Sequence, residues 1–228
     1  MRELAQIVEE IRAGFAVKNQ ARDVTLSRSR ELIRLCSLAI RAIHRHEWAE
    51  ANELLKTARE TAAAMAAGVA DHGDLYEAGY TQDALKELAE AHLLYAFVGG
   101  AEQEGTLCIM AGPNDLGIPP APYLNGLGEA ASELRRYVLD LIRQGKTAEA
   151  EPYLAVMDDV YTHLVTIDFP DALTGGLRRT TDMLRGVLER TRGDLTVAVR
   201  QEELQAALQE STLCISAFEK RIAGAPLG

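Results

Sequence analysis

Two glutamates lie on the apolar side of one predicted helix. In the segment ALKELAEAHLLYAFV (84–98), Glu87 shares a helical stripe with the apolar residues Leu94 and Val98. Glu90 lies just beside that stripe. A buried ionised carboxylate is costly unless it is paired, hydrogen-bonded or bound to a metal. The placement of these two acids therefore points to a site with chemistry of its own.

A second acidic pair lies in the segment YLNGLGEAASELRRYVLDLI (123–142), where Glu129 and Glu133 are four residues apart. Each pair falls on one helical face, so packing of the two helices would bring four carboxylates together. Their repulsion would raise a pKa or require cations, and all-oxygen ligation is what Mg²⁺ or Mn²⁺ prefers. Such ions activate water and stabilise the transition state of phosphodiester cleavage. Gly126 and Gly128 would permit close backbone approach near this site.

Other site chemistries lack their motifs. A di-iron carboxylate bundle needs Glu-x-x-His, but Glu90, Glu129 and Glu133 are followed at the third position by leucine, serine and arginine. The chain has no Walker loop, dinucleotide-binding glycine motif, GxSxG or HExxH. Acid pairs at these spacings are also common on solvated helix faces, so a purely structural role stays open.

The predicted helix over 22–46 is rich in arginine, although the net charge of the protein is −10. Six arginines and only two acids lie between residues 18 and 45. Four of the arginines fall within an arc of about 60° at 100° per residue: Arg30, Arg34, Arg41 and Arg45. The arginine fork is well suited to phosphate. The alternative is that these side chains pair with acids on neighbouring helices or at an oligomer interface.

Neither the cysteines nor the apolar segments point to secretion or to a membrane. The cysteines Cys36, Cys108 and Cys214 are odd in number and far apart, which indicates core residues in a reducing compartment. No apolar run approaches the roughly 20 residues that span a bilayer. The first residues form an amphipathic helix with acids, unlike a secretory signal. We therefore expect a cytoplasmic protein without a membrane partner.

Helical signals run through most of the chain. The pattern predicts helices over 1–18, 22–46, 47–68, 82–98, 122–144, 147–166, 172–191 and 195–219. The turn-rich segment 99–119 is expected to connect two helices of the same domain. The only strand candidate, LCIMA (107–111), is short and isolated. The expected architecture is all-α, with one domain over 1–228 and a disordered tail at 220–228.

Three segments together resemble a known family. The stretch ARDVTLSRSRELIRLCSLAIRAIHR (21–45) resembles the arginine-rich helix of the translin family. LKELAEAHLLYAFV (85–98) resembles the acidic helix of its Trax (translin-associated factor X) branch, which has two glutamates three residues apart in the same apolar frame. YLNGLGEAASELRR (123–136) is similar to the second acidic helix of the family. The resemblance extends, with gaps, over about residues 15–192.

The resemblance implies a translin-like α-bundle of about seven helices that assembles into a closed, hollow oligomer, usually an octamer. It also implies binding of single-stranded RNA and DNA and, for the Trax branch, a divalent-metal-dependent endoribonuclease activity inside the shell. Carried over by position, the catalytic and metal-binding acids would be Glu87, Glu90 and Glu129, with Glu133 as a further metal carboxylate. The family usually has aspartate where this chain has Glu129, which is one methylene longer.

The RNA-binding residues implied by the resemblance are Arg22, Arg30 and Arg34. An acidic exterior with arginines facing an enclosed cavity would bind RNA inside and repel it outside. Two functions follow for testing. One is a homo-oligomeric endoribonuclease that uses Mg²⁺ or Mn²⁺ to cleave single-stranded RNA. The alternative is a non-catalytic, translin-like protein that binds single-stranded RNA or DNA; a helical scaffold without a nucleic-acid role is what composition alone suggests.

Overall fold

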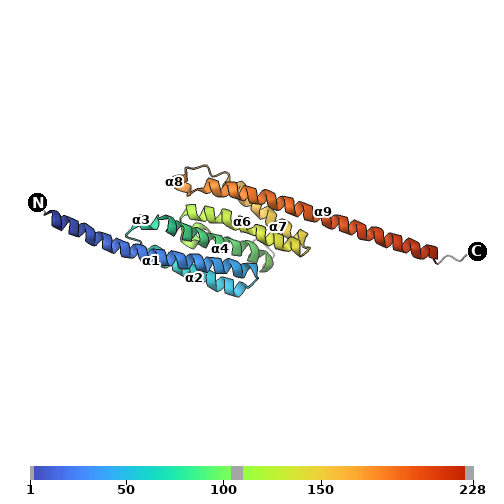
Figure 1. Ribbon diagram of the computed structural model, residues 1–228, viewed down its shortest axis with the longest axis horizontal. Coiled ribbons are helices and arrows are strands. Elements are labelled where there is room, and N and C mark those ends of the chain that lie inside the picture. Colours follow the sequence, from blue (N-terminus) through green and yellow to red (C-terminus); the bar gives the residue numbers. More distant parts are fainter. Residues whose placement is uncertain (1–2, 104–109, 224–228) are drawn as a thin grey trace, which may run out of the picture.

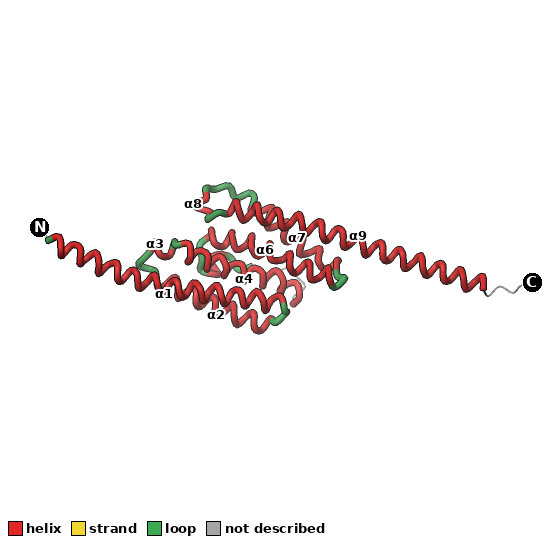
Figure 2. Tube along the Cα trace, viewed as in Figure 1, coloured by secondary structure: helices red, strands yellow, loops and turns green. Residues whose placement is uncertain are grey.

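The structure, a computed structural model, describes residues 3–103 and 110–223, and all regular structure in these ranges is helical (Figure 2). The long helices are α1 (Leu4–His44), α2 (Trp48–Ala67), α4 (Gly79–Gln103), α6 (Pro120–Arg143), α7 (Thr147–Leu164) and α9 (Leu177–Ala223). The short helices are α3 (Gly73–Tyr76), α5 (Pro113–Leu116) and α8 (Asp171–Thr174). The all-α prediction is therefore confirmed.

The long helices lie side by side, with α4 and α6 in the middle of the bundle (Figure 1). α1 packs against α2 and α4, α4 packs against α6, and α6 packs against α7 and α9. The core is built mainly from leucine and alanine on these faces, as at Leu32, Leu88 and Leu134. Because α4 and α6 pack against each other, the connection between them joins two helices of one domain, as predicted.

The two longest helices extend beyond the bundle at opposite ends, α1 with its first residues and α9 with its last (Figure 1). We call these extensions the terminal arms. Large apolar side chains are exposed along them at helical spacing. On α1 they include Leu4, Val8, Ile11 and Phe15, and on α9 they include Leu204, Leu208, Ile215 and Phe218. Contiguous exposed apolar surface of this kind is typical of an interaction site.

Predicted breaks between helices are wrong at two places, because α1 runs without a break through residues 18–22 and α9 runs through residues 192–194. The helix predicted over 172–191 is also wrong, because Gly175 and Gly176, both with positive φ, separate α8 from α9. An interior glycine costs a helix about 1 kcal/mol relative to alanine. Contacts on both sides of Gly193 offset this cost. Leu188 and Leu195 are buried in the core, and Asp194 accepts a hydrogen bond from Arg135 of α6 at 2.7 Å. In α1, the residues 19–21 contain neither glycine nor proline, so nothing local stops the helix.

The predicted end of α4 at Gly99 is also wrong, because the helix continues to Gln103. Gly99 serves packing instead: a Cβ added there would lie 3.2 Å from the Trp48 ring. Cys36 is buried as predicted, whereas Cys214 is exposed on α9. α9 includes residues 220–223 of the predicted tail. Cys108, residues 107–109 of the strand candidate and residues 224–228 lie outside the described ranges.

Candidate metal centre

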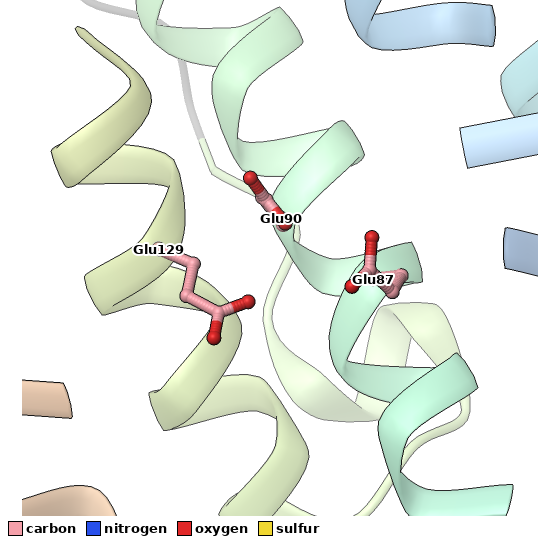
Figure 3. Close-up of side chains that lie close together, drawn as sticks. All are labelled: Glu87, Glu90 and Glu129. Atoms are coloured by element: carbon pink, nitrogen blue, oxygen red, sulfur yellow. The ribbon is translucent and has the colours of Figure 1, made fainter. Parts of the chain in front are cut away.

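Three carboxylates converge between the two central helices. Glu87 and Glu90 on α4 and Glu129 on α6 each offer an oxygen atom, and these atoms all lie within 4.8 Å of one another (Figure 3). We call these residues the carboxylate trio. Oxygen ligands of one Mg²⁺ lie at about 2.0–2.1 Å from the ion, hence at most about 4.2 Å apart. Small side-chain rotations would therefore let the trio hold a hard divalent cation, and its all-oxygen donor set fits one.

A glycine explains why α4 and α6 come close enough to form the trio. A Cβ added to Gly126 would lie 2.6 Å from the Lys86 carbonyl oxygen and 2.7 Å from the Ala89 Cβ. The two backbones are thus in direct contact about one turn before Glu129, as the sequence suggested. Gly128 serves a different neighbour, since a Cβ there would lie 2.6 Å from the Thr180 Cγ2 atom of α9.

Burial and repulsion both act on the α4 glutamates. The pKa of Glu90 is raised to about 8, mainly by burial and then by the negative charges of Glu87, Glu129 and Glu133, against the opposing effect of Lys86. The pKa of Glu87 is raised mainly by burial as well. A carboxyl group that resists ionisation at neutral pH is what a cluster of acids produces when no cation compensates the charge.

A lysine contacts the trio. The Lys86 Nζ atom donates a hydrogen bond to the Glu129 Oε1 atom at 2.8 Å, and each side chain is 24% exposed. Sequence reasoning missed this residue. Its signal was its position: Lys86 directly precedes Glu87, at the edge of the acidic stripe.

Glu133 lies close enough to influence Glu90 but is not one of the three carboxylates that converge among the described residues. Its Oε1 atom lies 2.7 Å from the Nε2 atom of His44 on α1, and Arg136 lies 3.6 Å away. The His44 side chain is only 4% exposed, and its Nδ1 atom has no hydrogen-bond partner. His44 is therefore an interhelical residue that holds the fourth carboxylate toward α1, a pairing that sequence reasoning did not identify.

The predicted RNA-binding arginines lie exposed on α1. We call Arg30, Arg34, Arg41 and Arg45 the arginine face. Arg34 pairs with Glu31 of its own helix at 2.6 Å, whereas Arg30 and Arg41 have no ion pair within residues 3–103 and 110–223. Arg22 pairs with the adjacent Asp23 at 3.1 Å. Among the described residues, pairing with acids on neighbouring helices, the alternative suggested by the sequence, does not occur at Arg22, Arg30 or Arg34. It does occur at Arg45, which lies 4.0 Å from Glu50 of α2.

The arginine face and the trio are separated by the body of α1. Cys36 lies on the buried side of this helix, where burial and then the charges of Glu87 and Glu90 raise the pKa of its thiol. Arg30 and Arg34 point to the opposite, exposed side. The chain thus presents the arginine face and the trio on different surfaces, and a single protomer does not bring these two groups together.

The bundle and its carboxylate cluster define a class of protein, an all-helical protein with a candidate divalent-metal site. No family model matches the chain. An uncharacterized protein from Methanocaldococcus jannaschii is 28% identical over 206 residues, which cover 89% of this chain and 87% of that protein.

Solved structures of C3PO, the translin and Trax type of complex, are similar to this chain. AfC3PO is 33% identical with a TM-score of 0.73, and the alignment covers 85% of this chain and 97% of that one. AfC3PO in complex with duplex RNA has the same identity and coverage and a TM-score of 0.69. Apo-NeC3PO, at 18% identity and a TM-score of 0.72, shares the fold over 87% of this chain and 98% of its own. The chain belongs to the translin family.

Proposed function

We propose that the protein is an endoribonuclease of the Trax branch that uses Mg²⁺ or Mn²⁺ to hydrolyse phosphodiester bonds of single-stranded RNA. The observation that carries this proposal is the convergence of Glu87, Glu90 and Glu129 in a partly buried space between two helices. Acids on a solvated helix face are free to turn away from one another into water, which relieves their mutual repulsion. Here the close contact at Gly126 holds them together.

Each residue of the site has a distinct role in this proposal. Glu87, Glu90 and Glu129 would hold the ion. Glu129, which is one methylene longer than the aspartate usual in the family, reaches the α4 pair. His44 fixes Glu133 beside the trio, where the negative charge of Glu133 adds to the demand for a cation. An ion held by these residues would supply Lewis acidity toward a phosphate oxygen and would activate a water molecule.

RNA binding by this chain is supported by its relatives and by α1. AfC3PO, a family member, has been solved in complex with duplex RNA. On this chain, the exposed arginine face together with Arg22 offers phosphate-binding groups. Arg30, which has no ion pair in the described part of the chain, is the most available of the predicted RNA-binding arginines. Single-stranded RNA or DNA follows from the family resemblance, so assays should compare single strands with a duplex.

Assembly into a hollow homo-oligomer, an octamer in the family pattern, is part of the same proposal. The terminal arms expose apolar side chains such as Ile11, Phe15 and Leu204, which another protomer would cover. Assembly would also bring the arginine face of one protomer near the trio of another, which a single chain does not do. A cytoplasmic location fits the free thiols of Cys36 and Cys214.

A second candidate is a translin-like protein that binds single-stranded RNA or DNA without cutting it. The observation that favours it is the ion pair between Lys86 and Glu129, because a lysine that neutralises the trio could replace a metal ion structurally. In that case the acids would stabilise the α4–α6 contact and the arginine face alone would account for function.

A cleavage assay separates the two functions. Fluorescent single-stranded and duplex RNAs would be incubated with the oligomer in Mn²⁺ or EDTA, for the wild type, Glu90→Gln and the control Glu53→Gln on the exposed side of α2. We expect Mn²⁺-dependent cutting that falls at least about 100-fold in Glu90→Gln, because the substitution removes a ligand charge, and that is unchanged in the control. A mobility shift without cutting, in Mn²⁺ and in EDTA, would establish the binding protein. The absence of both cutting and a mobility shift would overturn both functions.

A further inference from the structure

The contact between Lys86 and Glu129 occupies an oxygen atom that the trio needs for a cation. The ammonium group lies 2.8 Å from Glu129 Oε1, and both side chains are only partly exposed. A carboxylate oxygen that accepts a hydrogen bond from an ammonium group is less available to a metal ion, and two cations so close together repel each other. Lysine and a divalent cation therefore compete for Glu129.

Lys86 and Glu129 also line a cleft of about 690 Å³ bounded by the N-terminal halves of α4 and α6, by α8 and by the start of α9. This volume lies within the range of about 300–1,000 Å³ that is usual for small-molecule sites. Arg179, in the first turn of α9, lines the same cleft, is exposed and has no ion pair in the described part of the chain. The acids Glu77 and Asp83 also border the cleft, but both are exposed to water, which screens them.

We propose that Lys86 exchanges Glu129 for a phosphate group of the RNA strand when a divalent cation binds the trio, and that Lys86 and Arg179 then hold this phosphate in the cleft. The proposal rests on the metal site proposed above. It identifies a substrate subsite, formed by Lys86 and Arg179, directly beside the metal centre.

The exchange follows from the charges and the reach of the side chains. A divalent cation attracts Glu129 more strongly than the ammonium group does, so it displaces Lys86. The lysine stem has four rotatable carbons, which allow the ammonium group to turn into the adjoining cleft. An unpaired ammonium group in this partly buried space is unfavourable, and an anion beside Arg179 relieves the cost. Metal and phosphate binding are therefore coupled, and each raises the affinity for the other by the same factor.

The test measures Mn²⁺ affinity by electron paramagnetic resonance, with and without an oligouridine whose phosphorothioate linkages resist hydrolysis. Without RNA, Lys86→Met should bind Mn²⁺ several-fold more tightly than the wild type, because the competitor is gone, whereas Arg179→Met should bind it equally. Adding the oligouridine should raise the Mn²⁺ affinity of the wild type and of Lys86→Arg, but much less that of Lys86→Met. In Mn²⁺, both methionine variants should lose several-fold in oligouridine affinity.

Unchanged or weaker Mn²⁺ binding by Lys86→Met in the absence of RNA would overturn the exchange. The exchange would also be overturned if oligouridine raised the Mn²⁺ affinity of Lys86→Met as much as that of the wild type. Failure of the underlying function has a different signature. If the wild type and Glu90→Gln bind Mn²⁺ equally, the trio is not the metal site and both proposals fall. If Glu90→Gln abolishes Mn²⁺ binding while Lys86→Met binds Mn²⁺ like the wild type, only the exchange is wrong. Circular dichroism of each variant checks that the helical bundle is retained.

Discussion

At the contact between α4 and α6, three carboxylates share a partly buried space, whereas the arginines of the arginine face are exposed and, among the described residues, pair with exposed acids or with none. Arg34 and Glu31 form an exposed pair that is worth little to stability, because water already solvates both charges. Glu90 has the opposite situation, with like charges around it and a raised pKa. A carboxyl group whose ionised form is disfavoured by its surroundings indicates a binding site, whereas a well-solvated surface charge carries little such information.

The largest expected effect tests the backbone contact that brings the trio together. Gly126→Ala would place a methyl group 2.6 Å from the Lys86 carbonyl oxygen, so the helices must move apart. We expect the free energy of unfolding to fall by about 3 kcal/mol, together with loss of Mn²⁺ binding. Urea unfolding followed by circular dichroism measures the first and Mn²⁺ titration the second.

The matched control is Gly193→Ala in α9, where an added Cβ meets nothing within 4 Å. It should stabilise the protein by about 0.5–1 kcal/mol, since alanine is the better helix former. Equal stability of Gly126→Ala and the wild type would mean that the close contact of α4 and α6 does not exist in solution.

A smaller effect is expected from pH on the metal-free protein. The pKa of Glu90 is about 8 in the folded state and 4.5 when unperturbed. Between these values the folded protein keeps a proton that the unfolded chain has lost, so this contribution to stability is present at low pH and disappears as the pH rises through 8. At about 1.4 kcal/mol per pH unit, we expect a decline of about 2–3 kcal/mol between pH 5 and 8 in EDTA.

Thermal and urea unfolding across this pH range would measure the decline, and Glu90→Gln should flatten it because glutamine does not titrate. Saturating Mn²⁺ should flatten it as well, since the cation favours the ionised carboxylate. A slope that is the same in Glu90→Gln and in the wild type would assign the decline to other groups and remove the evidence for a charge held at a disadvantage.

The smallest expected effect lies on the arginine face. Arg30→Gln should lower RNA affinity roughly threefold to tenfold and reduce the slope of log affinity against log salt by about one. Arg34→Gln should have the weaker effect, because the donors of Arg34 already serve Glu31. Fluorescence anisotropy at several salt concentrations measures both, with the exposed Arg143→Gln at the end of α6 as the control. Equal losses in all three variants would indicate a general charge effect without a defined arginine face.

Much of the site could be predicted because it depends on local spacing. The acids at 87, 90 and 129 were selected by their places on helical faces, and the structure brings their oxygen atoms together. The role of Gly126 followed from the need for close approach. Glu133 lies on the same helical face as Glu129, yet it contacts His44. Its partner was not predictable because His44 belongs to a third helix, α1, whose position depends on packing.

No helix in the described ranges is long and apolar enough to cross a membrane, in agreement with the absence of a long apolar run in the sequence. The helix boundaries were less predictable. Glycine at 193 and at 99 indicated an end, but packing against α6 and against Trp48 carries both helices through. A single glycine changes helix stability by about 1 kcal/mol, and tertiary contacts exceed that easily.

The sequence by itself determined that the protein is helical, which side of each helix is apolar, and which acids lie on the wrong side, because each of these depends on residues within a few turns of one another. Only the tertiary structure decided which charges meet. Lys86 finds Glu129 across 43 residues and His44 finds Glu133 across 89. The strength of a charge interaction depends on distance and burial, and neither is fixed until the helices have packed.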